Sequence, residues 1–117
     1  MSNQPPRPAP PLSKLRRLGS TVYLSGELGF DADGAIPDGI EAQTHACLQN
    51  IARTLATEGL SLSDVVSTSC ILTDPDDFAA FNAVYASYFP EPRPVRTTYA
   101  AGLMIAAKLE ITAIAEG

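Results

Sequence analysis

The chain has 117 residues and a mass of 12.3 kDa, which predicts one domain with a modest core. Its net charge of −5 and pI near 4.6 argue against a general nucleic-acid binder, which needs a basic face. The sequence contains no run of 18 apolar residues and no hydrophobic secretory signal, so we expect a cytoplasmic protein with no membrane span.

Apolar residues make up 45% of the chain and charged residues only 18%. So little polar material cannot easily cover the surface of a small monomer, and we therefore expect an oligomer. The two cysteines, Cys47 and Cys70, fall in a predicted helix and a predicted strand. We interpret them as reduced core residues rather than as a disulfide.

The first eleven residues contain five prolines. Proline fixes φ and removes a backbone donor, so residues 1–11 are predicted to form a flexible or polyproline-like tail. A single domain is expected over residues 12–117. Its first elements are two short strands over residues 12–17 and 20–25, joined by a turn at Leu18-Gly19.

A helix is predicted after a glycine-rich and acidic loop. Asp38, followed three residues later by Glu41, has the form of a capping box, and Gly59 suits the end of the helix. The apolar stripe at helical spacing consists of Leu48, Ile51 and Leu55. His45, the only histidine, has no second ligand at metal-binding spacing. We interpret it as a surface or packing residue.

A β-branched run over residues 65–73 predicts a buried strand. The next helix begins with Asp74 as a cap and Pro75 at the first position, followed by two further acids that favour the positive end of the helix dipole. This capping role explains the acidic cluster without a metal. The aromatic residues of the helix form a stripe that we interpret as core: Phe78, Phe81, Tyr85 and Tyr88.

Two more strands are predicted near the end of the chain. Pro94 precedes the β-prone run 95–99, which carries Arg96, and residues 108–116 alternate between apolar and polar. The alternation places Glu110 and Thr112 on one face, about 7 Å apart along the strand. A fixed cation near hydroxyls and a carboxylate suits the binding of a small acid.

The predicted order of elements is therefore ββαβαββ. It favours an α+β fold in which both helices pack on one face of a mixed sheet. The sequence shows no Walker loop, no GxGxxG, no nucleophile elbow and no Cys/His metal spacing. We expect neither a cofactor nor a metal, and the residues alone indicate a small-acid binder or a hydrolase.

Residues 12–115 resemble the RidA (YjgF/YER057c/UK114) family. The similarity runs in order through most of the chain, and no single motif carries it. The matching stretches are Leu18-Gly19, Ser25-Gly26, residues 47–51 (CLQNI), 59–66 (GLSLSDVV), 77–85 (DFAAFNAVY), 94–98 (PVRTT) and 109–115 (LEITAIA).

The resemblance implies a chorismate-mutase-like α+β fold, assembled as a homotrimer with sites in the clefts between subunits. It also implies hydrolysis of reactive 2-imino or 2-enamino acids to 2-keto acids and ammonia. Arg96 falls on the family's arginine, which pairs with the substrate carboxylate, and guanidinium suits that bidentate task better than ammonium. Ser25 and Asn82 fall on positions that line the cleft, and the backbone at Thr98 would face the ligand.

Three departures from the family pattern bear on catalysis. The glutamate that positions the attacking water falls at Thr112, a cysteine falls at Thr98, and a tyrosine near the first strand falls at Leu12. A threonine can hydrogen-bond to water but cannot serve as a carboxylate base at neutral pH. Glu110 shares the predicted face of Thr112.

Three functions remain open at this point. The first is imine deamination, in which the protein orients a water on an already electrophilic carbon. The second is a non-catalytic binder or sensor of small carboxylates. The third and weakest is RNA cleavage or inhibition of translation, because the acidic chain offers no basic patch.

Overall fold

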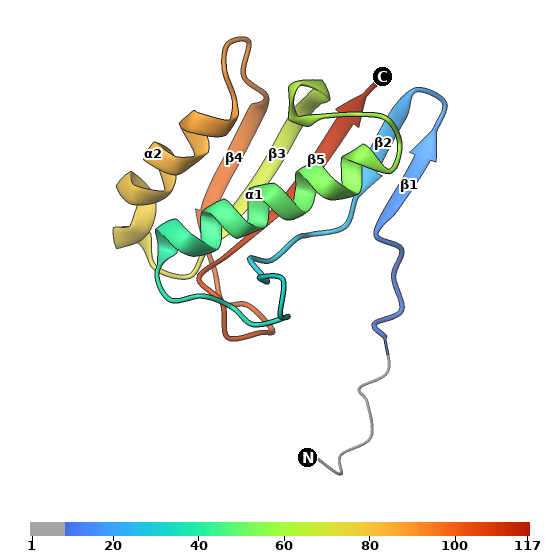
Figure 1. The fold of residues 1–117 in the computed structure, drawn as a ribbon. Coiled ribbons are helices and arrows are strands. Elements are labelled where there is room, and N and C mark those ends of the chain that lie inside the picture. Colours follow the sequence, from blue (N-terminus) through green and yellow to red (C-terminus); the bar gives the residue numbers. More distant parts are fainter. Residues whose placement is uncertain (1–8) are drawn as a thin grey trace.

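A computed structural model describes residues 9–117, and Figure 1 shows their path. Part of the expected proline-rich tail, residues 1–8, lies outside the described residues. In chain order the elements are β1 (Leu15–Leu18), β2 (Thr21–Leu24), α1 (Ile40–Ala56), a 3-10 turn (Leu62–Asp64), β3 (Val65–Leu72), a second 3-10 turn (Pro75–Asp77), α2 (Phe78–Tyr88), β4 (Val95–Ala100) and β5 (Leu109–Glu116).

The strands form one mixed sheet in the order β1-β2-β5-β3-β4. Only β3 and β4 are parallel, and the other neighbours are antiparallel. Both helices lie on the same side of this sheet (Figure 1). The predicted α+β class and the helices on one face are therefore confirmed.

The core fills the space between the sheet and the two helices. From α1 it takes the predicted stripe of Leu48, Ile51 and Leu55, and from β5 it takes the alternating residues Leu109, Ile111, Ala113 and Ala115. Cys47 and Cys70 are both buried and free, as predicted. Burial raises the pKa of both thiols, so they stay protonated near neutral pH.

The two predicted helix starts have different outcomes. The Asp74 carboxylate accepts a hydrogen bond from the Asp76 N–H at 2.9 Å, so this capping role is confirmed. The capping box at Asp38 is wrong, because α1 begins after Gly39 and has no side-chain cap. Gly39 has φ 89°, a left-handed conformation that glycine adopts without strain, and it redirects the chain before the helix begins.

The face of the sheet opposite the helices has no covering layer among residues 9–117. It carries several exposed apolar side chains, among them Leu18, Tyr23, Val95 and Tyr99. The loop between β4 and β5 adds Met104 and Ile105, which are also exposed. In residues 9–117, neither helix has the length and apolar character that a membrane span requires.

Candidate active site

Arg96 lies on β4, the edge strand, where Pro94 has just directed the chain into an extended path. Its pairing with Thr68 places it on the helix-covered face of the sheet, since Thr68 is buried against α2. The guanidinium carbon Cζ lies 4.8 Å from the ring centroid of Tyr85, 5.4 Å from that of Phe81 and 5.7 Å from that of Phe78. Three aromatic faces therefore hold the cation by cation–π attraction.

These rings are themselves fixed in place. Tyr85 is buried, and its hydroxyl lies 2.7 Å from the Thr68 Oγ1 on β3. Burial raises the pKa of the Tyr85 phenol, although the Thr68 hydrogen bond opposes this effect, so the ring remains neutral. The aromatic stripe was predicted to be core, and this is right for Phe81 and Tyr85. Phe78 is 44% exposed, because it faces Arg96 at the sheet edge and not the core.

A cavity of about 290 Å³ opens beside the Arg96 guanidinium. Its lining consists of Asn82, Tyr85, Ala86, Arg93, Pro94 and Arg96. Arg93 is already engaged, since it donates to the Phe89 carbonyl and to the Glu91 carboxylate, both at 2.8 Å. The ion pairs found in residues 9–117 do not involve Arg96, so its charge is available to an incoming anion.

Two polar atoms near Arg96 are buried without a hydrogen-bond partner in the described part of the chain. They are the Asn82 Oδ1 and the Thr98 Oγ1. Thr98 follows Arg96 by two residues on the same face of β4 and lines a cavity of about 240 Å³ with largely apolar walls. Buried polar atoms normally have partners, so these two are exceptions within the described residues.

Glu110 and Thr112 share one face of β5, as the alternation predicted. That face is the one opposite Arg96. Thr112 pairs with Ser69 of β3, whereas Arg96 pairs with the next residue back, Thr68, and successive strand residues point to opposite faces. The structure therefore does not bring Arg96 together with Thr112 or Glu110 within one chain.

Glu110 lies beside the segment that follows β2. A Cβ added to Gly26 would lie 2.6 Å from the Glu110 Oε2, so the carboxylate packs directly on this glycine. Glu110 also lines a cavity of about 110 Å³ with Leu28, Leu103, Met104 and Ile105. The neighbouring Ser25 hydroxyl donates to the Ser13 carbonyl, and Leu12 is 59% exposed at the entrance to β1.

The expected site residues thus form two groups on opposite faces of the sheet. Arg96, Asn82 and Thr98 form one, and Glu110 lies with Gly26 and Ser25 in the other. Sequence reasoning missed the aromatic cradle under Arg96. The signal was present, because an aromatic stripe on a helix next to a strand with one arginine suits cation binding as well as core packing.

The family model described as Endoribonuclease L-PSP matches residues 2–117. Among curated proteins, Reactive Intermediate Deaminase A, chloroplastic, of Arabidopsis thaliana is 39% identical over 108 residues, which are 90% of this chain and 58% of that protein. The mouse 2-iminobutanoate/2-iminopropanoate deaminase is 32% identical over 108 residues, covering 90% of this chain and 80% of the relative.

Solved structures of other proteins have the same fold. RidA from an Antarctic Psychrobacter species superposes with a TM-score of 0.89 at 33% identity, covering 99% of this chain and 96% of the other. TdcF of Escherichia coli with bound serine superposes with a TM-score of 0.88 at 32% identity, covering 96% and 92%.

Proposed function

We propose that this chain, which belongs to the RidA (Endoribonuclease L-PSP) family, hydrolyses 2-imino and 2-enamino acids to 2-keto acids and ammonia. The observation that carries this proposal is the Arg96 guanidinium, held on three aromatic rings beside a cavity and free of ion pairs within residues 9–117. Such a cation suits the one feature that all these substrates share, a carboxylate next to the reacting carbon.

Arg96 binds the substrate carboxylate in this proposal. The unpartnered Thr98 hydroxyl can donate to this carboxylate, and the unpartnered Asn82 Oδ1 can accept from the N–H of the substrate nitrogen. The aromatic rings exclude water from one side of the guanidinium and strengthen its attraction for an anion. The substrate is then fixed with its C=N carbon open to attack.

The chemistry is addition of water to the C=N bond. The water oxygen attacks the imine carbon, and the water gives up a proton to a base. The nitrogen takes up one proton to give the carbinolamine and a second to leave as ammonia, while the hydroxyl loses its proton and the C–O bond becomes the carbonyl of the keto acid. The carbon is already electrophilic, so a positioned water and one proton acceptor are sufficient catalysis.

We assign the proton acceptor to Glu110 and a supporting hydrogen bond to Thr112. The resemblance places the family's glutamate at Thr112, but only Glu110 has a carboxylate on this face of β5. Because Glu110 and Arg96 occupy opposite faces in one chain, each site requires Arg96 of one subunit and Glu110 of its neighbour. A homotrimer with sites between subunits, which also covers the open face of the sheet, provides this pairing.

Ser25 and Leu12 belong to the same half of the site as Glu110, so they would meet the ligand from the neighbouring subunit. The exposed Leu12 offers an apolar contact and lacks the hydroxyl of the tyrosine found in the family pattern.

The alternative function is a carboxylate binder without catalysis. In that case Arg96 keeps its role in binding, and Glu110 has no catalytic role.

RNA cleavage is less favoured. The chain carries 13 acidic against 8 basic residues, and its only histidine, His45, shares a hydrogen bond of 2.8 Å with the Tyr88 hydroxyl between the two helices. A phosphate backbone needs a basic surface, and general acid–base cleavage needs free titratable groups.

The test is ammonia and keto-acid release from imino acids made in situ by an amino-acid oxidase. The proposal predicts that the protein accelerates release above the spontaneous rate, with a dependence on Arg96. A protein that binds 2-keto acids but leaves the rate of release unchanged would instead be a binder or sensor.

A further inference from the structure

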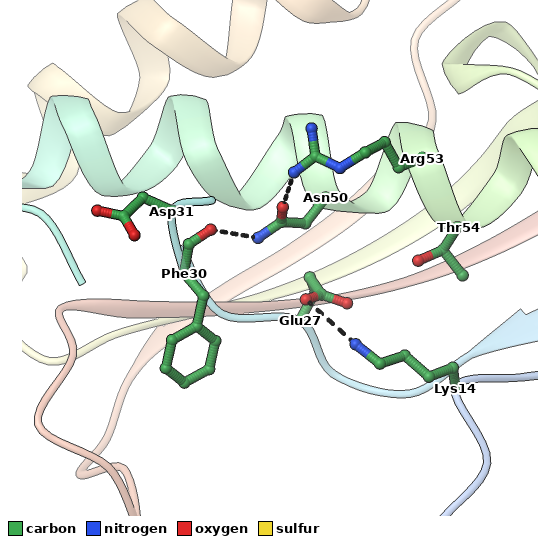
Figure 2. A pocket seen from close by; sticks show the side chains of 7 residues that line it. All are labelled: Lys14, Glu27, Phe30, Asp31, Asn50, Arg53 and Thr54. Carbon is green, nitrogen blue, oxygen red and sulfur yellow. Dashed lines mark hydrogen bonds and ion pairs between the residues drawn. The ribbon is translucent and has the colours of Figure 1, made fainter. Parts of the chain in front are cut away.

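A second cavity, of about 210 Å³, lies between α1 and the segment that follows β2. The sheet order places it far from the Arg96 edge, because β2 and β4 are separated by β5 and β3. Figure 2 shows its lining, with Asn50, Arg53 and Thr54 projecting from α1 and Lys14, Glu27, Phe30 and Asp31 contributed by the segments beside it.

The walls of this cavity are built by hydrogen bonds. The Asn50 amide Nδ2 donates to the Leu28 carbonyl at 3.1 Å and to the Phe30 carbonyl at 2.9 Å, and both bonds hold the loop against α1. Figure 2 shows the bond to Phe30. The Asp31 Oδ1 accepts from the backbone N–H groups of Asp33 and Ala35. Both side chains therefore serve the framework, although Asp31 also adds its negative charge to the lining, and three further charged groups face the cavity.

The first of these is Glu27, whose side chain is only 12% exposed. Its one ion-pair partner within residues 9–117 is Lys14, whose Nζ lies 4.0 Å from Oε1, at the outer limit of such a pair. Burial raises the pKa of the Glu27 carboxyl, and Lys14 and Arg53 only partly oppose this. A desolvated carboxylate with one distant cation lacks close donors.

The other two groups are cations. The Arg53 guanidinium donates through Nη2 to the Asn50 Oδ1, which leaves its other N–H groups available to the cavity. The Lys14 side chain is 77% exposed and approaches the cavity from the side of β1 (Figure 2). The cavity thus presents positive and negative groups together.

This charge pattern selects among ligand classes. A free inorganic anion would meet Lys14 and Arg53 but also the carboxylate of Glu27, which repels it. A divalent cation would find no group of three His, Cys, Asp or Glu ligands anywhere in residues 9–117. A molecule that carries both an ammonium and a carboxylate satisfies all three groups at once.

The volume of the cavity also bears on the class of ligand. This volume is about 210 Å³. Pockets for drug-sized ligands start at about 300 Å³, so this cavity suits a smaller molecule. The small α-amino acids have the right size and the right charges.

We propose that this cavity is a binding site for a small α-amino acid, with the ammonium on Glu27 and the carboxylate on Arg53 and Lys14. Phe30 is the aromatic residue of the lining. The site shares no residue with the cavity at Arg96 and does not depend on the proposed deaminase reaction.

The test is an NMR titration of the full chain with L-alanine, followed by backbone amide shifts. We expect saturable shifts at Glu27, Phe30, Asp31, Asn50 and Arg53. Propionate carries only the carboxylate of alanine, and ethylamine carries only its ammonium. Each should bind with an affinity at least about tenfold lower than that of alanine, as expected for loss of one charged hydrogen-bonded contact. The variant Arg96→Ala should keep the alanine shifts, which separates this site from the other.

Variants identify the two charge contacts. Glu27→Gln and Arg53→Gln should each weaken alanine binding by about tenfold or more, whereas Glu41→Gln and Arg16→Gln, at exposed positions elsewhere, should leave it unchanged. Absence of saturable shifts in the wild-type chain at about 10 mM alanine would overturn the proposal, even if a variant fails to fold. Equal affinity for alanine and propionate would overturn it as well, because it would show an anion site.

Discussion

Arg96 combines an exposed β-strand position with three aromatic rings that lie close to its guanidinium. Cation–π contacts leave its N–H donors free, so the guanidinium can still donate two parallel hydrogen bonds to a carboxylate. Lysine at this position would keep the charge and lose the planar stacking. The role proposed for Arg96 therefore depends on its shape as well as its charge.

Substitution of Arg96 should weaken ligand binding in graded steps. We expect Arg96→Lys to lower the affinity for a small 2-keto acid by about tenfold and Arg96→Ala by about a hundredfold, since two charge-assisted hydrogen bonds become one and then none. Isothermal titration calorimetry measures this order. Arg93→Lys is the matched control in the same cavity, because Arg93 is already bound to Phe89 and Glu91. Equal affinity across wild type and both Arg96 variants would remove Arg96 from the site.

Glu27 illustrates a residue that costs stability at neutral pH. Its pKa is raised above 4.5 in the folded chain, mainly by burial. Between 4.5 and the raised value, the folded chain binds more protons than the unfolded chain, so stability falls as the pH rises through this interval. Such a cost is compatible with a residue that is retained for binding, since stability and function often trade off.

Glu27→Gln should remove this pH-dependent loss. Relative to wild type, the variant should gain free energy of unfolding as the pH rises from about 4 through the raised pKa, and the gain should then level off. Urea unfolding at a series of pH values gives the measurement, and Glu41→Gln is the exposed control. Parallel profiles for Glu27→Gln and wild type would show that Glu27 is not desolvated.

At the scale of elements, alternation along β5 determines which side chains share a face. The pattern over residues 108–116 correctly separated the buried Leu109 and Ile111 from Glu110 and Thr112. A one-strand pattern cannot relate that face to Arg96, because the relation depends on β3 lying between β4 and β5 in a given register. The alternation therefore predicts which residues of β5 share a face, and the strand register shows that this face lies opposite Arg96.

The two helices were also predicted only in part from the sequence. Apolar spacing correctly predicted the buried side of α1, and a proline with flanking acids correctly predicted the turn before α2. The start of α1 was missed because Gly39 adopts φ 89°, a backbone choice that the Asp38 motif does not encode. The open side of α2 was missed because Phe78 contacts Arg96, and that contact spans 18 positions in the chain.

The two polar residues of β5 allow a test that separates their roles. Glu110→Gln should lower kcat for imine hydrolysis by about a hundredfold, the usual contribution of a positioned base, with KM changed by less than about threefold. Thr112→Ala should change kcat by less than about tenfold, since it removes only a supporting hydrogen bond. The reverse order, with Thr112→Ala the slower enzyme, would return the water-positioning role to Thr112.

At the scale of the whole molecule, the uncovered face of the sheet is the dominant feature. Val95 is 72% exposed and Tyr99 is 50% exposed on that face, and the uncharged loop after β4 adds the fully exposed Met104. A surface of this kind is unfavourable in water unless another copy of the chain covers it. The same face carries Glu110, so assembly would both bury apolar area and complete the site.

We expect sedimentation equilibrium at micromolar concentration to give three times the chain mass of 12.3 kDa. Val95→Asp should shift the population toward monomer, because a charge on the covered face is costly to desolvate, while far-UV circular dichroism stays unchanged. Glu41→Asp, on the outer surface of α1, is the control. A wild-type chain that remains monomeric would contradict both the trimer and the shared site.

The central claim is that each deaminase site uses Arg96 from one subunit and Glu110 from the next. The direct measurement is imine hydrolysis by trimers refolded from equal amounts of Arg96→Ala and Glu110→Gln chains, each of which is almost inactive alone. Random mixing places both intact residues in about a quarter of the sites, so activity should recover to about a quarter of the wild-type rate. Mixed trimers no more active than either parent would contradict the claim, because a site formed within one chain cannot be rescued by a neighbour.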